Sequence, residues 1–266
     1  MTEPVILVDK KDNIALVTLN RPLALNTMNV QMATGLRQTF ADLEYDEGVR
    51  CVVIKGAGEH FCAGGDVQFF ASLIKDSSEE RKGIIHSLIA DIHDAIISIR
   101  RMPKPVLTSV RGAAAGFGVS LMLAADLAVA SKNAYFKLAY TDIGLSPDGG
   151  ATFALPRILG QRRAMQLILM NDSLNSEAAC NIGMINWVVE DDVLEEKTLE
   201  IAKKLAKGPT EAFTHVKEAL NNTFHNTLAQ QLDLEKNLFL SCLETQDFAE
   251  GVMSFLEKRN PNFKGE

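Results

Sequence analysis

The sequence has few cysteines, and they lie far apart. The four are Cys51, Cys62, Cys180 and Cys242, and none forms a CxxC pair or a Cys/His spacing typical of a zinc site. This scarcity favours reduced thiols in a cytoplasm-like compartment. We therefore expect a cytoplasmic protein with no metal centre.

Long apolar runs and an excess of basic residues are also missing. No stretch approaches the roughly 18 apolar residues of a membrane span, and the N-terminal segment lacks the pattern of a secretory signal. Lys and Arg total 27 against 34 Asp and Glu, a formal charge of -7. Such a balance disfavours nucleic acid as a partner, because phosphates need a basic face. This charge balance is compatible with an anionic small molecule that is bound by a local group of cations.

The chain contains strands that alternate with helices, followed by helices alone. Its 266 residues are 47% hydrophobic, enough for a well-buried core. Alternating or apolar runs predict a hairpin at 4–20 and strands near 50–55, 105–110, 126–130, 134–137 and 184–190. The last part predicts helices at about 193–206, 209–221, 227–243 and 245–257. The expected fold class is α/β, with a core in residues 1–191 and a helical region in 192–266.

Residues 112–118, GAAAGFG, join an expected strand to an expected helix. Small side chains let another backbone or a ligand approach closely. The first N–H groups of a helix have no partner within it and lie at the positive end of its dipole. The pattern therefore indicates either an anion site or close packing of helix on sheet. It is not a dinucleotide fingerprint, because Leu121 stands where GxGxxG needs its last glycine.

Two further loops carry candidate groups. HFCAGGD, residues 60–66, follows an expected strand, and Asp66 suits the cap of the next helix. SPDGG places Asp148 before two glycines, a pattern typical of a turn or helix cap as well as of a catalytic acid. Two loops that each offer one N–H would suit a thioester oxygen as it becomes an enolate.

HFCAGGD, GAAAGFGVSLMLAAD and IGLSPDGGATFALPRILG together resemble the crotonase superfamily of enoyl-CoA hydratases and isomerases. The resemblance runs from NRPLALN at residues 20–26 to FLEKRNPNFKG at the end. It implies a spiral of ββα units with an all-helical C-terminal region, assembled as a homotrimer or a dimer of trimers. It also implies an acyl-CoA substrate and no cofactor, since coenzyme A is part of the substrate.

The resemblance assigns the oxyanion hole to the backbone N–H groups of Gly65 and Phe117. Many members have Gly or Ala where Phe117 stands; since only its N–H is needed, we expect the hole to be kept and the pocket to be narrower. Contacts with CoA carry over to Arg21, Ala24, Leu25, Ala63 and Asp66, and to Phe255 and Lys258, which in the family often come from a neighbouring subunit.

The carboxylates depart from the hydratase pattern. Hydratases of the family hold a water between two glutamates, and alignment places Ser120 and Tyr140 at those positions. Neither acts as a carboxylate near neutral pH. Asp148 is the acid in reach, as in the isomerase branch that includes the 1,2-epoxyphenylacetyl-CoA isomerases of phenylacetate breakdown. Tyr140 is expected to flank the site, where it contacts substrate, tunes Asp148 or covers it.

The favoured hypothesis is an isomerase in which Asp148 moves a proton from C2 to C4 of an enoyl-CoA. A hydratase is the first alternative. A hydrolase or dehalogenase would use Asp148 as nucleophile and His93 to activate water, as in related aroyl-CoA dehalogenases, which carry tryptophan in place of Tyr140. A non-catalytic acyl-CoA binder is the third alternative. Candidate residues for the acyl pocket are Phe69, Phe70, Leu73 and Phe153.

Overall fold

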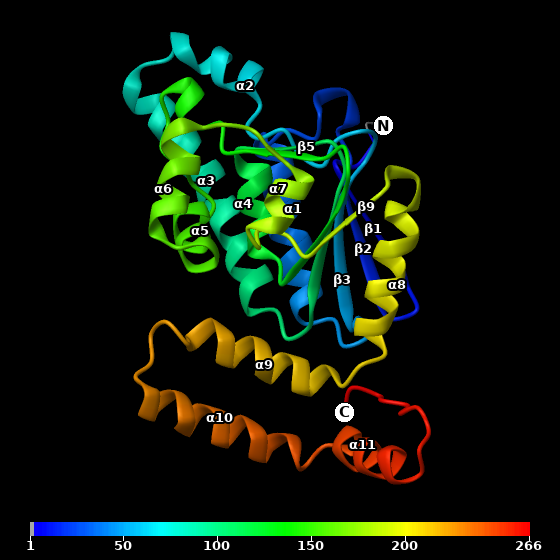
Figure 1. Ribbon diagram of the computed structural model, residues 1–266. Coiled ribbons are helices and arrows are strands. Elements are labelled where there is room, and N and C mark those ends of the chain that lie inside the picture. Colours follow the sequence, from blue (N-terminus) through cyan, green and yellow to red (C-terminus); the bar gives the residue numbers. More distant parts are fainter. Residues whose placement is uncertain (1–2) are drawn as a thin grey trace.

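The computed structural model describes residues 3–266 and has two sheets surrounded by helices (Figure 1). The main sheet has six strands in the order β1-β2-β3-β4-β6-β9, parallel except for the antiparallel hairpin β1–β2. Its strands are β1 (Ile6–Lys11), β2 (Ile14–Leu19), β3 (Cys51–Gly56), β4 (Val106–Val110), β6 (Leu127–Ser131) and β9 (Trp187–Val189). The predicted α/β class is confirmed.

Helices cover both faces of the main sheet, which explains why its central strands are continuously apolar. Val52 and Ile54 of β3 belong to the large core formed with α1 (Val30–Glu44), α3 (Ser78–Arg101) and α4 (Phe117–Ala124). Cys51 and Val53 point to the opposite face and pack with α8 (Leu194–Ala206). Because successive side chains of a strand point to opposite faces of the sheet, β3 contributes side chains to both hydrophobic cores.

The helices begin where polar capping residues stand in the sequence. The side chain of Asn29 accepts a hydrogen bond from the N–H of Met32, and α1 starts at Val30, directly after Asn29. Ser77 and Glu80 form a capping box at the start of α3. Helix α3 ends at Arg101, just before Pro103.

A second, small sheet lies at the end of the molecule that carries the glycine-rich loops (Figure 1). Its order is β5-β7-β8, with β5 (Ala113–Ala115), β7 (Tyr135–Lys137) and β8 (Leu174–Asn175). Strands β5 and β8 were not predicted, because three and two residues are too short for a periodic signal. The remaining elements of this part are α2 (Val67–Ser72), α5 (Ala151–Leu159), α6 (Gln161–Met170), α7 (Ser176–Asn181) and the 3-10 turns at Pro22–Ala24, Leu73–Lys75, Thr141–Ile143 and Asp191–Val193.

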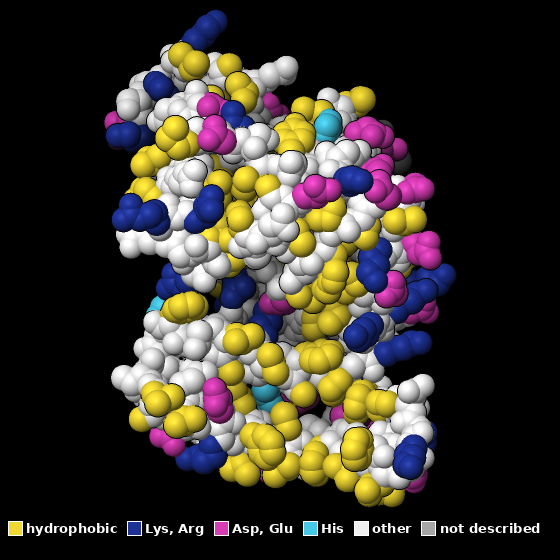
Figure 2. Space-filling view, in the orientation of Figure 1, with side chains coloured by type: hydrophobic (Ala, Val, Ile, Leu, Met, Phe, Trp, Pro, Cys, Tyr) yellow, Lys and Arg dark blue, Asp and Glu magenta, His cyan; other side chains and the backbone are white. Residues whose placement is uncertain are grey.

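The C-terminal helices pack in two ways. Helix α8 packs on the sheet through Leu194, Ile201 and Ala202, so in space it belongs with the core. The projecting part is α9 (Thr210–Asn222), α10 (Leu228–Cys242) and α11 (Gln246–Leu256), which lie below the core in Figure 1. Hydrophobic side chains are spread over this part in Figure 2. Among the helices of residues 3–266, none is long and apolar enough to cross a membrane.

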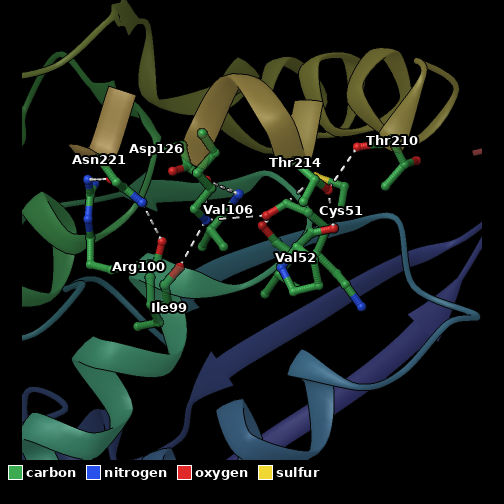
Figure 3. A network of polar contacts seen from close by, with 12 residues as sticks. Cys51, Val52, Ile99, Arg100, Val106, Asp126, Thr210, Thr214 and Asn221 are labelled. Atoms are coloured by element: carbon green, nitrogen blue, oxygen red, sulfur yellow. Dashed lines mark hydrogen bonds and ion pairs between the residues drawn. The ribbon is translucent and has the colours of Figure 1, made fainter. Parts of the chain in front are cut away.

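Polar contacts join α9 to the core (Figure 3). Lys217 donates to Asp126 Oδ2 at 2.8 Å and to the carbonyl oxygen of Ile99 at 2.9 Å. The amide of Asn221 donates to the carbonyl of Arg100 at 2.9 Å, and the Arg100 guanidinium donates back to that amide. Burial lowers the pKa of Lys217 even though the Asp126 carboxylate opposes the shift. These partly buried hydrogen bonds therefore attach α9 to the core.

Candidate active site

The two glycine-bearing loops run side by side. The N–H of Cys62 donates to Ala113 at 3.0 Å, and the N–H of Ala115 donates to Cys62 at 2.9 Å, as in a parallel β-bridge. Gly64 and Gly116 follow, with φ of +95° and +50°. A Cβ on Gly116 would lie 3.3 Å from the Cα of Gly64. Both the positive φ and the close approach of the two backbones therefore require glycine here.

Gly65 and Phe117 directly follow these two glycines. Within residues 3–266, neither of their backbone N–H groups donates a hydrogen bond to the chain. Phe117 is the first residue of α4, where N–H groups have no partner in the helix. A Cβ on Gly65 would come 2.6 Å from the ring of Phe70, so a larger residue here would displace that ring. The two predicted oxyanion donors thus lie in adjacent loops and are free to bind a ligand.

Asp148 lies against the same end of α4. Gly149 has φ of +58°, and a Cβ on it would come 2.9 Å from both the Phe117 ring and the Cβ of Ser120. The Ser120 hydroxyl also donates to the carbonyl oxygen of Asp148 at 2.9 Å. The segment that carries the acid therefore packs on the helical turn that begins with Phe117.

The Tyr140 hydroxyl donates to Asp148 Oδ1 at 2.6 Å and lies 3.0 Å from the Ser120 hydroxyl. Tyr140 is 9% exposed. Burial, and then the neighbouring Asp148 charge, raise the pKa of Tyr140, so it remains a protonated donor. The two positions that the family resemblance aligns with glutamates of hydratases thus both donate to Asp148, Tyr140 to its carboxylate and Ser120 to its backbone carbonyl. The sequence indicated that Tyr140 flanks the site, but it gave no sign of this bond.

Other acids near the loops already have cationic partners. Asp66 caps α2 as predicted and forms an ion pair with Arg21 at 2.9 Å. Burial opposes ionisation of Asp66, but the Arg21 guanidinium and the helix N–H groups outweigh it and hold the pKa of Asp66 below its usual value. Asp142 is half exposed and pairs with Lys137 at 2.7 Å. In the described chain, no Lys, Arg or His forms an ion pair with Asp148.

The structure brings together most of the residues predicted to contact CoA. The NRPLALN loop joins the HFCAGGD loop through a bond from the N–H of Ala63 to the carbonyl of Leu25, 3.0 Å long. Arg21 stands at the N-cap of the 3-10 turn Pro22–Ala24, and Ala24 ends that turn just before Leu25. The five residues, Asp66 included, lie in or beside the oxyanion loops.

Phe255 and Lys258 lie elsewhere. Phe255 is 83% exposed on α11, at the end of the molecule opposite α2 and β5 (Figure 1). Lys258 follows the same helix in a left-handed conformation, with φ of +54°. Within one chain they do not meet the other predicted CoA residues. Their role stays a prediction that requires a neighbouring subunit.

His93 and the predicted acyl pocket can also be placed. His93 is exposed on α3, and within residues 3–266 it makes no hydrogen bond to Asp148. A cavity of about 520 Å³ opens beside Ser120, Gly149 and Gly150, and Phe153 is one of its lining residues. Phe69, Phe70 and Leu73 are not among its lining residues. No set of three or more His, Cys, Asp or Glu in the described part of the chain is arranged to hold a metal ion.

Comparisons with known proteins show the family to which this chain belongs. Residues 9–266 match the enoyl-CoA hydratase/isomerase family. A 1,2-epoxyphenylacetyl-CoA isomerase of Escherichia coli is 36% identical, covering 98% of both chains. A "probable enoyl-CoA hydratase" of Rhodobacter capsulatus is 38% identical, covering 96% of this chain and 95% of its own. The crystal structure of an enoyl-CoA hydratase from Polaromonas has a TM-score of 0.90 at 33% identity, covering 97% of this chain and 99% of the other.

The chain therefore belongs to the enoyl-CoA hydratase/isomerase family, within the crotonase superfamily. The fold expected from the resemblance, an α/β crotonase-type core with a helical C-terminal region, is confirmed. Its similar proteins include both an isomerase and hydratases.

Proposed function

We propose that this protein is an acyl-CoA isomerase that shifts a double bond through an enolate. Asp148 would be its only base, and the N–H groups of Gly65 and Phe117 would form its oxyanion hole. The observation that carries the proposal is the hydrogen-bonded group of Tyr140, Ser120 and Asp148. Where a hydratase of the family has two carboxylates, this chain has two hydroxyls bound to a third residue.

The proposed reaction needs one base. In a β,γ-unsaturated acyl-CoA, the thioester acidifies the proton on C2. Asp148 would remove that proton while two N–H groups stabilise the charge on the enolate oxygen; such donors each contribute roughly 3 kcal/mol in a dry site. The same carboxyl then returns the proton at C4, and the double bond moves to the α,β position. The carboxylate ends as it began, so the reaction consumes neither water nor a cofactor.

Two substrate types share the first step of this reaction, the removal of the C2 proton to give an enolate. The first is a linear Δ3-enoyl-CoA converted to its Δ2 isomer. The second is a ring epoxide of phenylacetyl-CoA, because the relative that is 36% identical is named for that substrate. Both keep the thioester at the same two N–H groups, so a common base and oxyanion hole would serve either one.

Replacing Asp148 by Asn tests the proposal. We expect isomerisation of 3-hexenoyl-CoA, followed by the absorbance of the conjugated product, to fall by roughly 10²- to 10⁴-fold, the usual contribution of a general base. Asp142→Asn is the matched control, because Asp142 is exposed and paired with Lys137. It should keep nearly full activity. Full isomerase activity in Asp148→Asn would refute the assignment.

The alternatives predict different products. A hydratase would convert crotonyl-CoA to 3-hydroxybutyryl-CoA in the wild type, with a rate unaffected by Asp148→Asn. A hydrolase or dehalogenase would place one oxygen-18 from solvent water in the Asp148 side chain during a single turnover. Its proposed water activator, His93, is exposed and not bonded to Asp148, which favours the isomerase. A non-catalytic binder would bind acyl-CoA and form no product at all.

A further inference from the structure

The cavity beside the proposed active site has a mainly apolar lining that includes several cations. Ser120, Gly149 and Gly150, next to Asp148, are among its lining residues. Its volume of about 520 Å³ lies within the usual range of ligand pockets. Three arginines also line it: Arg100, Arg101 and Arg157. No acidic residue of the described chain is part of this lining.

Two of these arginines have no carboxylate partner. Arg101 is paired with Glu44 at 2.7 Å, whereas Arg100 and Arg157 form no ion pair within residues 3–266. Acidic residues outnumber basic ones in this chain, 34 to 27. Two unpaired guanidinium groups that line one cavity therefore give it a local positive charge. In Figure 2, Lys and Arg side chains border the hollow between the core and the projecting helices.

Both guanidinium groups are held in place by neighbours that leave donors free. The Arg157 guanidinium carbon lies 3.5 Å from the centre of the Phe153 ring, and Phe224 is its second aromatic neighbour. This stacking covers the face of the group and leaves N–H groups at its edge. Its buried Nε has no acceptor within residues 3–266. Arg100 is bonded to the side chain of Asn221, as Figure 3 shows, which uses one of its five N–H donors.

We propose that this cavity takes the acyl part of the substrate and that Arg100 and Arg157 select acyl groups with a carboxylate at the end remote from the thioester. The inference rests on the proposed function, because it places the thioester at Gly65 and Phe117. The apolar part of the acyl chain would lie along the walls of the cavity past Ser120 and Gly150. Its terminal carboxylate would pair with Arg100 and Arg157. Guanidinium donors match the geometry of a carboxylate.

The test compares the binding of matched pairs of saturated acyl-CoA thioesters, which bind without turnover. The pairs are butyryl- and succinyl-CoA, hexanoyl- and adipoyl-CoA, and octanoyl- and suberoyl-CoA, measured by titration calorimetry. We expect the carboxylate-ended member to bind at least about tenfold more tightly at one chain length, as expected for a hydrogen bond between charged groups. Equal or weaker binding of the carboxylate-ended member at all three lengths would overturn the proposal.

Variants show whether the arginines cause the preference. Arg100→Gln and Arg157→Gln should each remove most of it, and Arg157→Lys should restore part by keeping the charge. Arg101→Gln is the control, because that guanidinium is already paired with Glu44. A preference that persists in both Arg100→Gln and Arg157→Gln would also overturn the proposal. A change of oligomeric mass in these variants without a change of selectivity would overturn it too, because the two arginines would then pair with acidic residues of a second copy of the chain.

The two proposals can fail separately. Loss of the binding preference in a protein that still isomerises 3-hexenoyl-CoA would overturn only the acyl-group selection. If the protein shows the binding preference but does not isomerise 3-hexenoyl-CoA, the acyl-group selection stands as a binding property and the proposed reaction is refuted. Failure to bind any of the six thioesters would overturn both. Thermal melting of each variant shows whether a lost preference reflects a lost fold.

Discussion

Asp148 has two carboxylate oxygens, and within the described residues only Oδ1 accepts a side-chain hydrogen bond. The donor, Tyr140, is buried and remains protonated because burial and the Asp148 charge raise its pKa. Oδ2 is therefore the oxygen available for a substrate proton. A base fixed at one oxygen can take a proton and return it on the same face of the substrate, which suits a shift between C2 and C4.

Tyr140→Phe should lower activity. The phenol donates the one side-chain hydrogen bond that Asp148 accepts within the described residues. Without it, Oδ1 loses its donor and the carboxylate loses its fixed orientation, so kcat should fall by roughly tenfold. Tyr135→Phe, on the exposed part of β7, is the control. An unchanged kcat in Tyr140→Phe would mean that Tyr140 acts only in packing.

Gly149→Ala should move Asp148 away from its position. The new Cβ would approach the Phe117 ring and Ser120 to 2.9 Å, and φ is +58°. Strain of this kind costs about 1–3 kcal/mol, and we expect a larger effect on activity than on unfolding. Gly144→Ala provides the comparison, because Gly144 has φ of +73° and nothing within 4 Å of its added Cβ. Equal loss of activity in both variants would show that φ strain alone matters.

At the scale of elements, α9 is attached to the core by Lys217. Its side chain is 9% exposed and bonded to Asp126 and to two backbone carbonyls. Removing it would leave a partly buried carboxylate unpaired, at a cost of about 3 kcal/mol. Lys217→Ala should lower the free energy of unfolding by that amount in urea titrations. Lys197→Ala breaks the exposed pair with Glu200 and should cost less than about 0.5 kcal/mol. Similar values for both variants would contradict the account.

The elements were largely predictable, and the contacts between them were not. Periodicity predicted the central strands and the helices from α8 to α11, because this signal is local in the sequence. The same local signals predicted the oxyanion loops and Asp148 only with the help of the family resemblance. The bond between Tyr140 and Asp148 depends on how a 3-10 turn and a loop pack on α4. Likewise, the amphipathic pattern of α8 showed that it buries one face, but not that this face covers the sheet.

At the scale of the whole molecule, the projecting helices expose much apolar surface. Exposed residues there include Leu220, Leu232, Phe239, Phe255 and Leu256. Surface of this kind marks an interaction site, and the family resemblance implies a homotrimer or a dimer of trimers. Light scattering should therefore give three or six times the mass of the chain. A monomer at micromolar concentration would contradict this prediction.

Assembly also bears on CoA binding. If Phe255 of one subunit contacts the CoA of another, Phe255→Ala should raise KM for acyl-CoA several-fold and leave kcat nearly unchanged, because uniform binding energy is lost. Leu228→Ala, an equally exposed position on α10, is the control. An unchanged KM in an intact oligomer would exclude the contact.

The most direct test of the central claim, that Asp148 alone moves the proton, follows the label of 3-hexenoyl-CoA deuterated at C2. With one base, part of the deuterium should appear at C4 of the 2-hexenoyl product, and Asp148→Asn should abolish both the product and the transfer. Complete loss of the label to solvent, together with formation of 3-hydroxyhexanoyl-CoA, would contradict the account and indicate a hydratase.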